Sequence, residues 1–272
     1  MTPLAPIRKS QAQAALRKRL AATNSQVDAR GYVNTPQENL LPGVDMTQFE
    51  NDLKEGDGDE LRMKFCAAHS SAALAVNTFA PFKTNPVGLH LLGNSGAMEL
   101  RFEKQLTVVP GRRPANLDVW IRGEHGIVAI ESKLLEYFDL KMAKFAPAYA
   151  ELESLAEENW WSVYQQSIKD PRQHLDRAQL IKHYLGLRRF QHAGTELGPI
   201  TLLYIFWEPT NWQDVEICKE HRAEVKAFAT QVCGSTVAFR WMTYPQLWND
   251  WLAIPSLAEH ASNLKNRYEV RL

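Results

Sequence analysis

Residues 117–133, LDVWIRGEHGIVAIESK, are apolar enough for two buried strands, yet they carry Asp118, Glu131 and Lys133 inside the run. A charged group in a buried sheet costs several kcal/mol unless it is paired, neutralised or bound to a metal ion. The three charges therefore need a physical explanation. That explanation decides both the fold and the function that we expect.

Gly123 and Gly126 flank the centre of the run, and this spacing predicts a tight β-hairpin with a loop of two or four residues. Both loop lengths give one register, in which Asp118 faces Glu131 across the ladder with Cβ atoms about 5 Å apart. Because side chains alternate along a strand, Lys133 lies on the same face, diagonal to Asp118. The hairpin therefore gathers the three charges.

Two directly opposed carboxylates repel each other, and a bound divalent cation removes that repulsion. Mg²⁺ takes carboxylate oxygens together with a backbone carbonyl, water and phosphate oxygens. The ammonium of Lys133 can orient an attacking water or neutralise charge in the transition state of a phosphodiester cleavage. The alternative is a local ion pair of Lys133 with Glu131 or Asp118, in a hairpin that is less buried than its composition indicates.

The rest of the chain places the hairpin in an α/β fold with a mixed central sheet flanked by helices. Three consecutive strands with short turns must be largely antiparallel, which excludes a doubly wound sheet. We expect helices at 10–22, 59–77, 147–168, 172–190 and 214–232, and two short helices at the end of the chain. We expect strands at 98–109, 200–209 and 235–244, and two strands within 117–133.

The 272 residues are 45% hydrophobic with zero formal net charge, which indicates a sizeable core and gives no global sign of nucleic-acid binding. We expect an N-terminal helix and surface arm over residues 1–58 and the main domain over residues 59–272. No apolar stretch is long enough for a membrane span, and the start has no hydrophobic signal core. With three cysteines and no CxxC pair, these features predict a cytoplasmic protein.

Asp118, followed by Glu131-Ser132-Lys133 at the end of a hydrophobic strand, resembles the PD-(D/E)XK nuclease superfamily, and within it a bacterial restriction-endonuclease-like group. Leu117 stands where that pattern nominally has proline. The resemblance implies an αβββαβ core at about 59–207, with the C-terminal strand and helices at 208–272. It also implies a Mg²⁺-dependent nuclease, with Mn²⁺ as substitute, in which Asp118, Glu131 and the carbonyl of Ser132 bind the metal and Lys133 acts on the attacking water.

Accessory residues are predicted with an alternative for each. In the resembled fold a glutamate on the first helix often completes the metal site, and Glu60 is the candidate, although it can equally form a capping box with Asp57. Glu103 is a second acidic candidate that an exposed strand face also explains. Gln179 matches a glutamine near the metal in some of these nucleases; their tyrosine follows one position earlier than Tyr184 does here, and a solvent-facing helix residue is the alternative.

DNA is the expected partner ahead of RNA, a homodimer is compatible with cutting both strands, and no membrane association is expected. No organic cofactor is expected. Residues 93–96 lack the lysine and the length of a phosphate-binding loop and are interpreted as a turn. The rival function is a non-catalytic, nuclease-like module that binds nucleic acid or protein.

Overall fold

The structure is a computed structural model that describes residues 7–23, 26–55, 64–194 and 198–272. Its centre is a sheet with strand order β1-β2-β3-β6-β7, and β4 and β5 form a separate pair. The strands are β1 (Ala97–Leu106), β2 (Ala115–Gly123), β3 (Gly126–Lys133), β4 (Lys141–Met142), β5 (Arg172–Gln173), β6 (Ile200–Phe206) and β7 (Val237–Thr243). Strands β1 to β3 are antiparallel, whereas β3, β6 and β7 run parallel. The predicted mixed sheet is confirmed.

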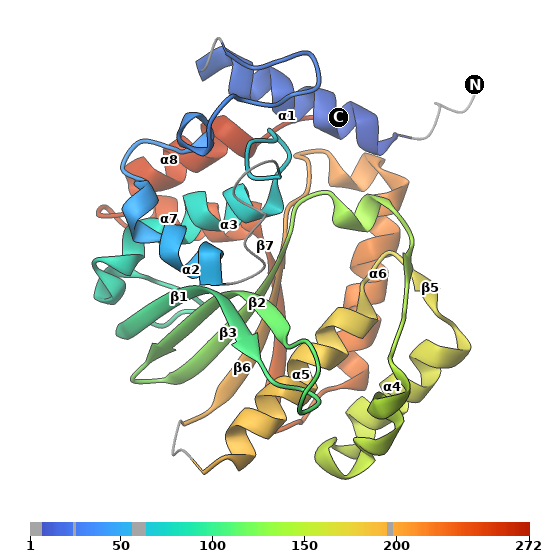
Figure 1. Cartoon of the computed structure of the whole chain (residues 1–272). Coiled ribbons are helices and arrows are strands. Elements are labelled where there is room, and N and C mark those ends of the chain that lie inside the picture. Colours follow the sequence, from blue (N-terminus) through green and yellow to red (C-terminus); the bar gives the residue numbers. More distant parts are fainter. Residues whose placement is uncertain (1–6, 24–25, 56–63, 195–197) are drawn as a thin grey trace, which may run out of the picture.

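Helices cover both faces of this sheet (Figure 1). They are α1 (Lys9–Thr23), α2 (Glu50–Glu55), α3 (Ser71–Phe79), α4 (Glu158–Lys169), α5 (Arg177–His192), α6 (Glu216–Gln231), α7 (Tyr244–Leu252) and α8 (Ala258–Tyr268). Helix α3 packs on β2 and β3 from one side, and α5 packs on β1, β2, β6 and β7 from the other, with α4 and α6 beside it. The arrangement is compatible with the restriction-endonuclease-like fold.

Short 3-10 helices occupy many of the connections. They are Pro36–Asn39, Met46–Gln48, Ala80–Lys83, Pro86–Gly88, Glu136–Phe138, Pro147–Glu151, Glu153–Leu155 and Trp212–Asp214.

The helix predicted over 59–77 is wrong in its extent. Residues 56–63, which include Glu60 and Asp57, lie outside the described part of the chain, and 64–70 form turns and a bridge from Ala67 to Tyr32. Helix α3 begins only at Ser71, because the hydroxyl of Ser70 accepts a hydrogen bond from the amide of Ala73 (3.2 Å) and caps the helix.

The two later helices also begin further along the chain than predicted. Most of the first part of 147–168 forms 3-10 turns, and α4 starts at Glu158 because Ala156 and Glu157 have extended backbone. The helix predicted at 172–190 starts at Arg177, where the side chain of Asp176 accepts from the amide of Gln179 (3.0 Å). The side-chain cap sets this boundary.

The apolar run of β6 lies between two parallel neighbours in the sheet and is buried almost throughout, as expected for a strand covered on both faces. The main core also takes in Ala12 and Leu16 from α1 and Phe49 and Leu53 from the segment before residue 56. The proposed boundary between an arm and a main domain stays a prediction. Within the described residues, no helix combines the length and the hydropathy that crossing a membrane requires.

Candidate active site

The hairpin of β2 and β3 has the register that the sequence predicts. Gly123 pairs with Gly126, and the ladder runs to Val119 opposite Ile130. Glu124 and His125 form the two-residue turn between the strands. Gly126 has φ +98° and would place a Cβ 2.0 Å from a backbone oxygen, so this position requires glycine.

The ladder stops one pair before Asp118 and Glu131 would meet. There the carboxylate of Asp118 enters between the strands and accepts a hydrogen bond from the backbone amide of Ser132 (2.6 Å). A buried amide must find an acceptor, and here a side chain replaces the neighbouring strand. The acid is therefore fixed to the backbone of the strand that carries the other two charges.

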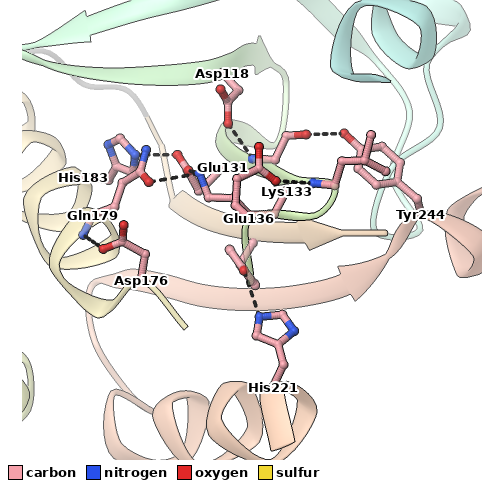
Figure 2. A network of polar contacts seen from close by, with 12 residues as sticks. Asp118, Glu131, Lys133, Glu136, Asp176, Gln179, His183, His221 and Tyr244 are labelled. Atoms are coloured by element: carbon pink, nitrogen blue, oxygen red, sulfur yellow. Dashed lines mark hydrogen bonds and ion pairs between the residues drawn. The ribbon is translucent and has the colours of Figure 1, made fainter. Parts of the chain in front are cut away.

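Glu131 is the centre of the network in Figure 2. One of its carboxylate oxygens contacts the ammonium of Lys133, and the other lies 2.6 Å from Nε2 of His183. The Glu131 side chain is 1% exposed and the Lys133 side chain 12% exposed. The local ion pair does form, but in a buried strand, so a poorly buried hairpin does not explain it.

Helix α5 supplies the second wall of the site. Oε1 of Gln179 accepts from the Lys133 ammonium (3.0 Å), and His183 lies one helical turn later on the same face. Tyr184 points elsewhere: its ring stacks on Trp160 with centroids 4.0 Å apart. His183 therefore occupies the position four residues after Gln179, where the resembled nucleases carry their tyrosine. This i,i+4 spacing is the sequence signal that could have identified His183.

Nδ1 of His183 has no hydrogen-bond partner in the described residues and is buried. An ionised carboxylate only accepts hydrogen bonds. Nε2 of His183 must therefore carry a hydrogen and donate it in the hydrogen bond to Glu131. His183 thus fixes one oxygen of Glu131 while Lys133 fixes the other.

The pKa values of the two acids in this network are shifted in opposite directions. Burial raises the pKa of Asp118 well above its ordinary value, and the nearby Glu131 carboxylate raises it further. Burial also opposes ionisation of Glu131, but Lys133 and His183 hold its pKa below the usual value. Although burial disfavours its charged form, the Lys133 ammonium has a pKa well above normal because Glu131 and Asp118 are close. The ammonium of Lys133 is therefore stabilised by two carboxylates, those of Glu131 and Asp118.

The back of the site is held by α7. The hydroxyl groups of Ser132 and Tyr244 are hydrogen bonded (2.7 Å), and both side chains are buried. Beyond the strand, Glu136 accepts from the amide of Leu134 (2.7 Å), which ties down the chain just after Lys133. Sequence reasoning missed Tyr244, because it is 112 positions from Ser132 and no local pattern joins them.

Glu103 lies on β1 between residues that pair with the two neighbours of Asp118. Its φ is +49°, in the left-handed region that non-glycine residues rarely occupy. The Glu103 carboxylate adds to the rise in the pKa of Asp118. Strained backbone of this kind often accompanies functional sites, and here it adjoins the charged cluster.

The structure thus brings together Asp118, Glu131, Ser132, Lys133 and Gln179, whereas Glu60 lies outside the described residues. Across the described ranges, no group of three or more histidine, cysteine, aspartate or glutamate side chains converges in a way that could hold a metal ion. A metal site here would therefore rest on two carboxylates completed by backbone, water and substrate oxygens.

Three comparisons with known proteins bear on this geometry. No curated protein and no solved structure matches the chain. A family model described as restriction endonuclease associating with ARP matches residues 8–269, nearly the whole chain. The match spans the hairpin, α5 and α7, the elements that form the cluster. This protein therefore belongs to the restriction endonuclease family whose members are described as associating with ARP.

Proposed function

We propose that this protein is a Mg²⁺-dependent nuclease that hydrolyses phosphodiester bonds in DNA, with the cluster on β2 and β3 as its active site. The observation that carries the proposal is the hydrogen bond from the Ser132 amide to Asp118. It holds a second carboxylate against the Glu131–Lys133 pair, in the order of charges that PD-(D/E)XK enzymes use. The family match supports a nuclease.

The donor set suits Mg²⁺. Asp118, Glu131 and the carbonyl of Ser132 offer only hard oxygen ligands, and Mg²⁺ prefers such oxygens together with water and phosphate. A carboxylate has about four lone-pair directions, so Lys133 and His183 do not exhaust those of Glu131. Burial and the nearby Glu131 carboxylate raise the pKa of Asp118, and a cation bound between the two acids would favour its ionised form.

When bound, Mg²⁺ would lower the pKa of a coordinated water and stabilise charge on the scissile phosphate. The protein groups then have separate tasks. Lys133 orients the attacking water or neutralises charge in the transition state, and Gln179 fixes the position of its ammonium. His183 fixes the orientation of Glu131. Glu60, on the segment before α3, remains our candidate for a further acidic ligand.

The test is cleavage of DNA by the purified full chain with Mg²⁺ or Mn²⁺, in parallel with Asp118→Asn, Glu131→Gln and Lys133→Met. Lys226→Met, on the exposed face of α6, is the matched control for loss of a lysine. We expect cutting by the wild type and by the control alone. Cutting that survives both Glu131→Gln and Lys133→Met contradicts the assignment of this site.

A second candidate function is a nuclease-like module that binds nucleic acid without cutting it. It is favoured by the engagement of both Glu131 oxygens by protein groups, and by the lack, within the described residues, of a group of three or more metal-binding side chains. DNA binding without cleavage under any divalent metal would select this candidate.

The family description also names an association with ARP, and we propose the same association for this chain.

A homodimer is the proposed assembly if the substrate is cut on both strands, because two copies related by a twofold axis present two equivalent centres. The mass of the protein in solution, measured with and without DNA, tests this point.

A further inference from the structure

A cavity of about 300 Å³ opens beside the candidate active site, between the turn that precedes β2 and the first turns of α5. Its lining includes Arg113, Asn116, Asp176, Gln179, Lys182 and His183. Gln179 and His183 contact Lys133 and Glu131 on their other sides. The cavity is therefore separated from the proposed reaction centre by single side chains.

Lys182 is a partly buried cation of this cavity that lies near two aromatic rings. Its ammonium lies 5.7 Å from the ring centroid of Phe145 and 5.9 Å from that of Tyr149. In the described part of the chain it forms no ion pair with a carboxylate. Burial lowers the pKa of Lys182, and the Asp176 carboxylate acts in the opposite direction. A partly desolvated cation without a counter-ion favours an anionic ligand.

The other charges allow such a ligand. Arg113 brings a second cation to the exposed rim of the cavity. Asp176 is the one carboxylate among the lining residues, and its Oδ1 is used as the cap of α5. An anion would consequently lie toward Lys182 and away from Asp176, whose carboxylate is expected to weaken binding.

We propose that this cavity is a subsite for a non-scissile phosphate of the DNA strand, with Lys182 as its ligand. The inference rests on the proposed nuclease function, because the cavity lies beside the point at which the strand would be cut. A phosphate held there would fix the register of the strand without taking part in the reaction. Lys182 is thereby a binding residue, distinct from Lys133.

The first experiment measures the affinity of the full chain for a fluorescent DNA oligonucleotide by anisotropy, in EDTA, over a range of salt concentrations. We expect Lys182→Met to bind about 10-fold more weakly than the wild type. The slope of log Kd against log salt should fall by about one unit, as for the loss of one phosphate contact. Lys226→Met should match the wild type, and Lys182→Arg should retain most of the affinity and show that charge is the cause.

The second experiment locates the contact. Oligonucleotides that carry one uncharged methylphosphonate linkage, moved position by position, should bind the wild type weakly at one linkage near the cleavage point. Lys182→Met should be insensitive at that linkage, because the partner charge is already gone. Asp176→Asn, which keeps a helix cap, should bind unmodified DNA more tightly.

Experiments with inorganic phosphate distinguish the two ligands that this cavity could take, a phosphate of the DNA strand and a free phosphate ion. If phosphate raises the melting temperature of the wild type but not of Lys182→Met, while both bind DNA equally, the cavity takes a free anion and the strand assignment is overturned. Equal DNA binding and an equal salt slope for both proteins, with no response to phosphate, overturn the subsite altogether.

The failures of the two proposals are distinguishable. A wild type that cuts DNA, together with unchanged DNA binding by Lys182→Met, overturns the subsite and leaves the nuclease standing. A wild type that never cuts, together with the expected weakening in Lys182→Met, overturns the nuclease and supports the subsite. A melting curve of each variant is the control that checks whether the variant is folded.

Discussion

Glu131 and Glu208 are buried glutamates near the carboxyl ends of neighbouring parallel strands, and they differ in how their charge is balanced. Glu208 follows β6 and accepts from Nε (2.7 Å) and Nη2 (2.5 Å) of Arg222, so that one carboxylate meets one guanidinium. Glu131 on β3 shares the single ammonium of Lys133 with Asp118, whose pKa is raised. The first is a complete ion pair of one carboxylate and one guanidinium, whereas the second places two carboxylates beside one ammonium and the ring of His183.

This difference separates a structural pair from a candidate reaction centre. Arg222 is also covered by the ring of Trp212, 3.9 Å from its guanidinium carbon, and so is held by packing as well as charge. A buried pair of this kind is costly to break from one side. The Asp118–Glu131 cluster, in contrast, has two carboxylates beside one lysine, and under the proposed function a bound metal ion would stabilise both acids.

The largest expected effect concerns activity. Glu131→Gln or Lys133→Met should lower the rate of DNA cleavage by at least about 10³-fold, since each removes a group to which the proposed function assigns the metal or the transition state. Glu208→Gln should leave the rate per folded molecule within about 3-fold of wild type. The check is single-turnover cleavage with Mg²⁺. A large loss of activity in Glu208→Gln alone would reverse the comparison.

The second effect concerns stability and has the opposite ranking. Glu208→Gln leaves Arg222 without its counter-ion and should lower the free energy of unfolding by about 3 kcal/mol. Glu131→Gln should lower it by less than half as much, because Asp118 becomes the partner of Lys133. Urea denaturation without metal ions measures both values. Equal losses would show that Glu131 is balanced in the same way as Glu208.

The third effect is a pH dependence caused by Asp118. Its folded pKa is raised above the unfolded value, so the folded state keeps a proton that the unfolded state releases. Stability should therefore fall as the pH rises from the ordinary aspartate pKa, 3.8, toward the raised one. The slope cannot exceed about 1.4 kcal/mol per pH unit for one group. Asp118→Asn should remove this component, and an unchanged pH profile of unfolding in that variant would contradict it.

The smallest effect is stabilisation by metal. At a Mg²⁺ concentration ten times the dissociation constant, the gain is about 1.4 kcal/mol, or roughly 3 °C in the melting temperature. We expect this shift in the wild type and in Glu208→Gln, and none in Asp118→Asn. A shift that persists in Asp118→Asn would place the metal elsewhere.

The sequence predicted what depends on local spacing. The hairpin register followed from two glycines and the alternation of side chains, and the order of elements followed from the hydrophobic patterns. The start of α3 was placed too early because the apolar spacing continues upstream of Ser70, where the cap ends it. Periodicity identifies the element, but capping hydrogen bonds determine where it begins.

Contacts between distant segments were beyond this kind of reasoning. Gln179 and Lys133 were both candidates, but only the folded chain shows that their side chains meet. His183 was passed over in favour of Tyr184, which instead packs against Trp160. The sequence around Glu208 also resembles that around Glu131, a glutamate near the end of an apolar strand, and only the pairing with Arg222 distinguishes the two.

The most direct test is a crystal of the full chain soaked in Mn²⁺ and measured for anomalous scattering. We expect a peak within coordination distance of carboxylate oxygens from both Asp118 and Glu131, with the carbonyl of Ser132 close by and no peak at Glu208. Density bound to neither acid, or an empty cluster at saturating Mn²⁺, would contradict the claim that this hairpin holds the catalytic metal.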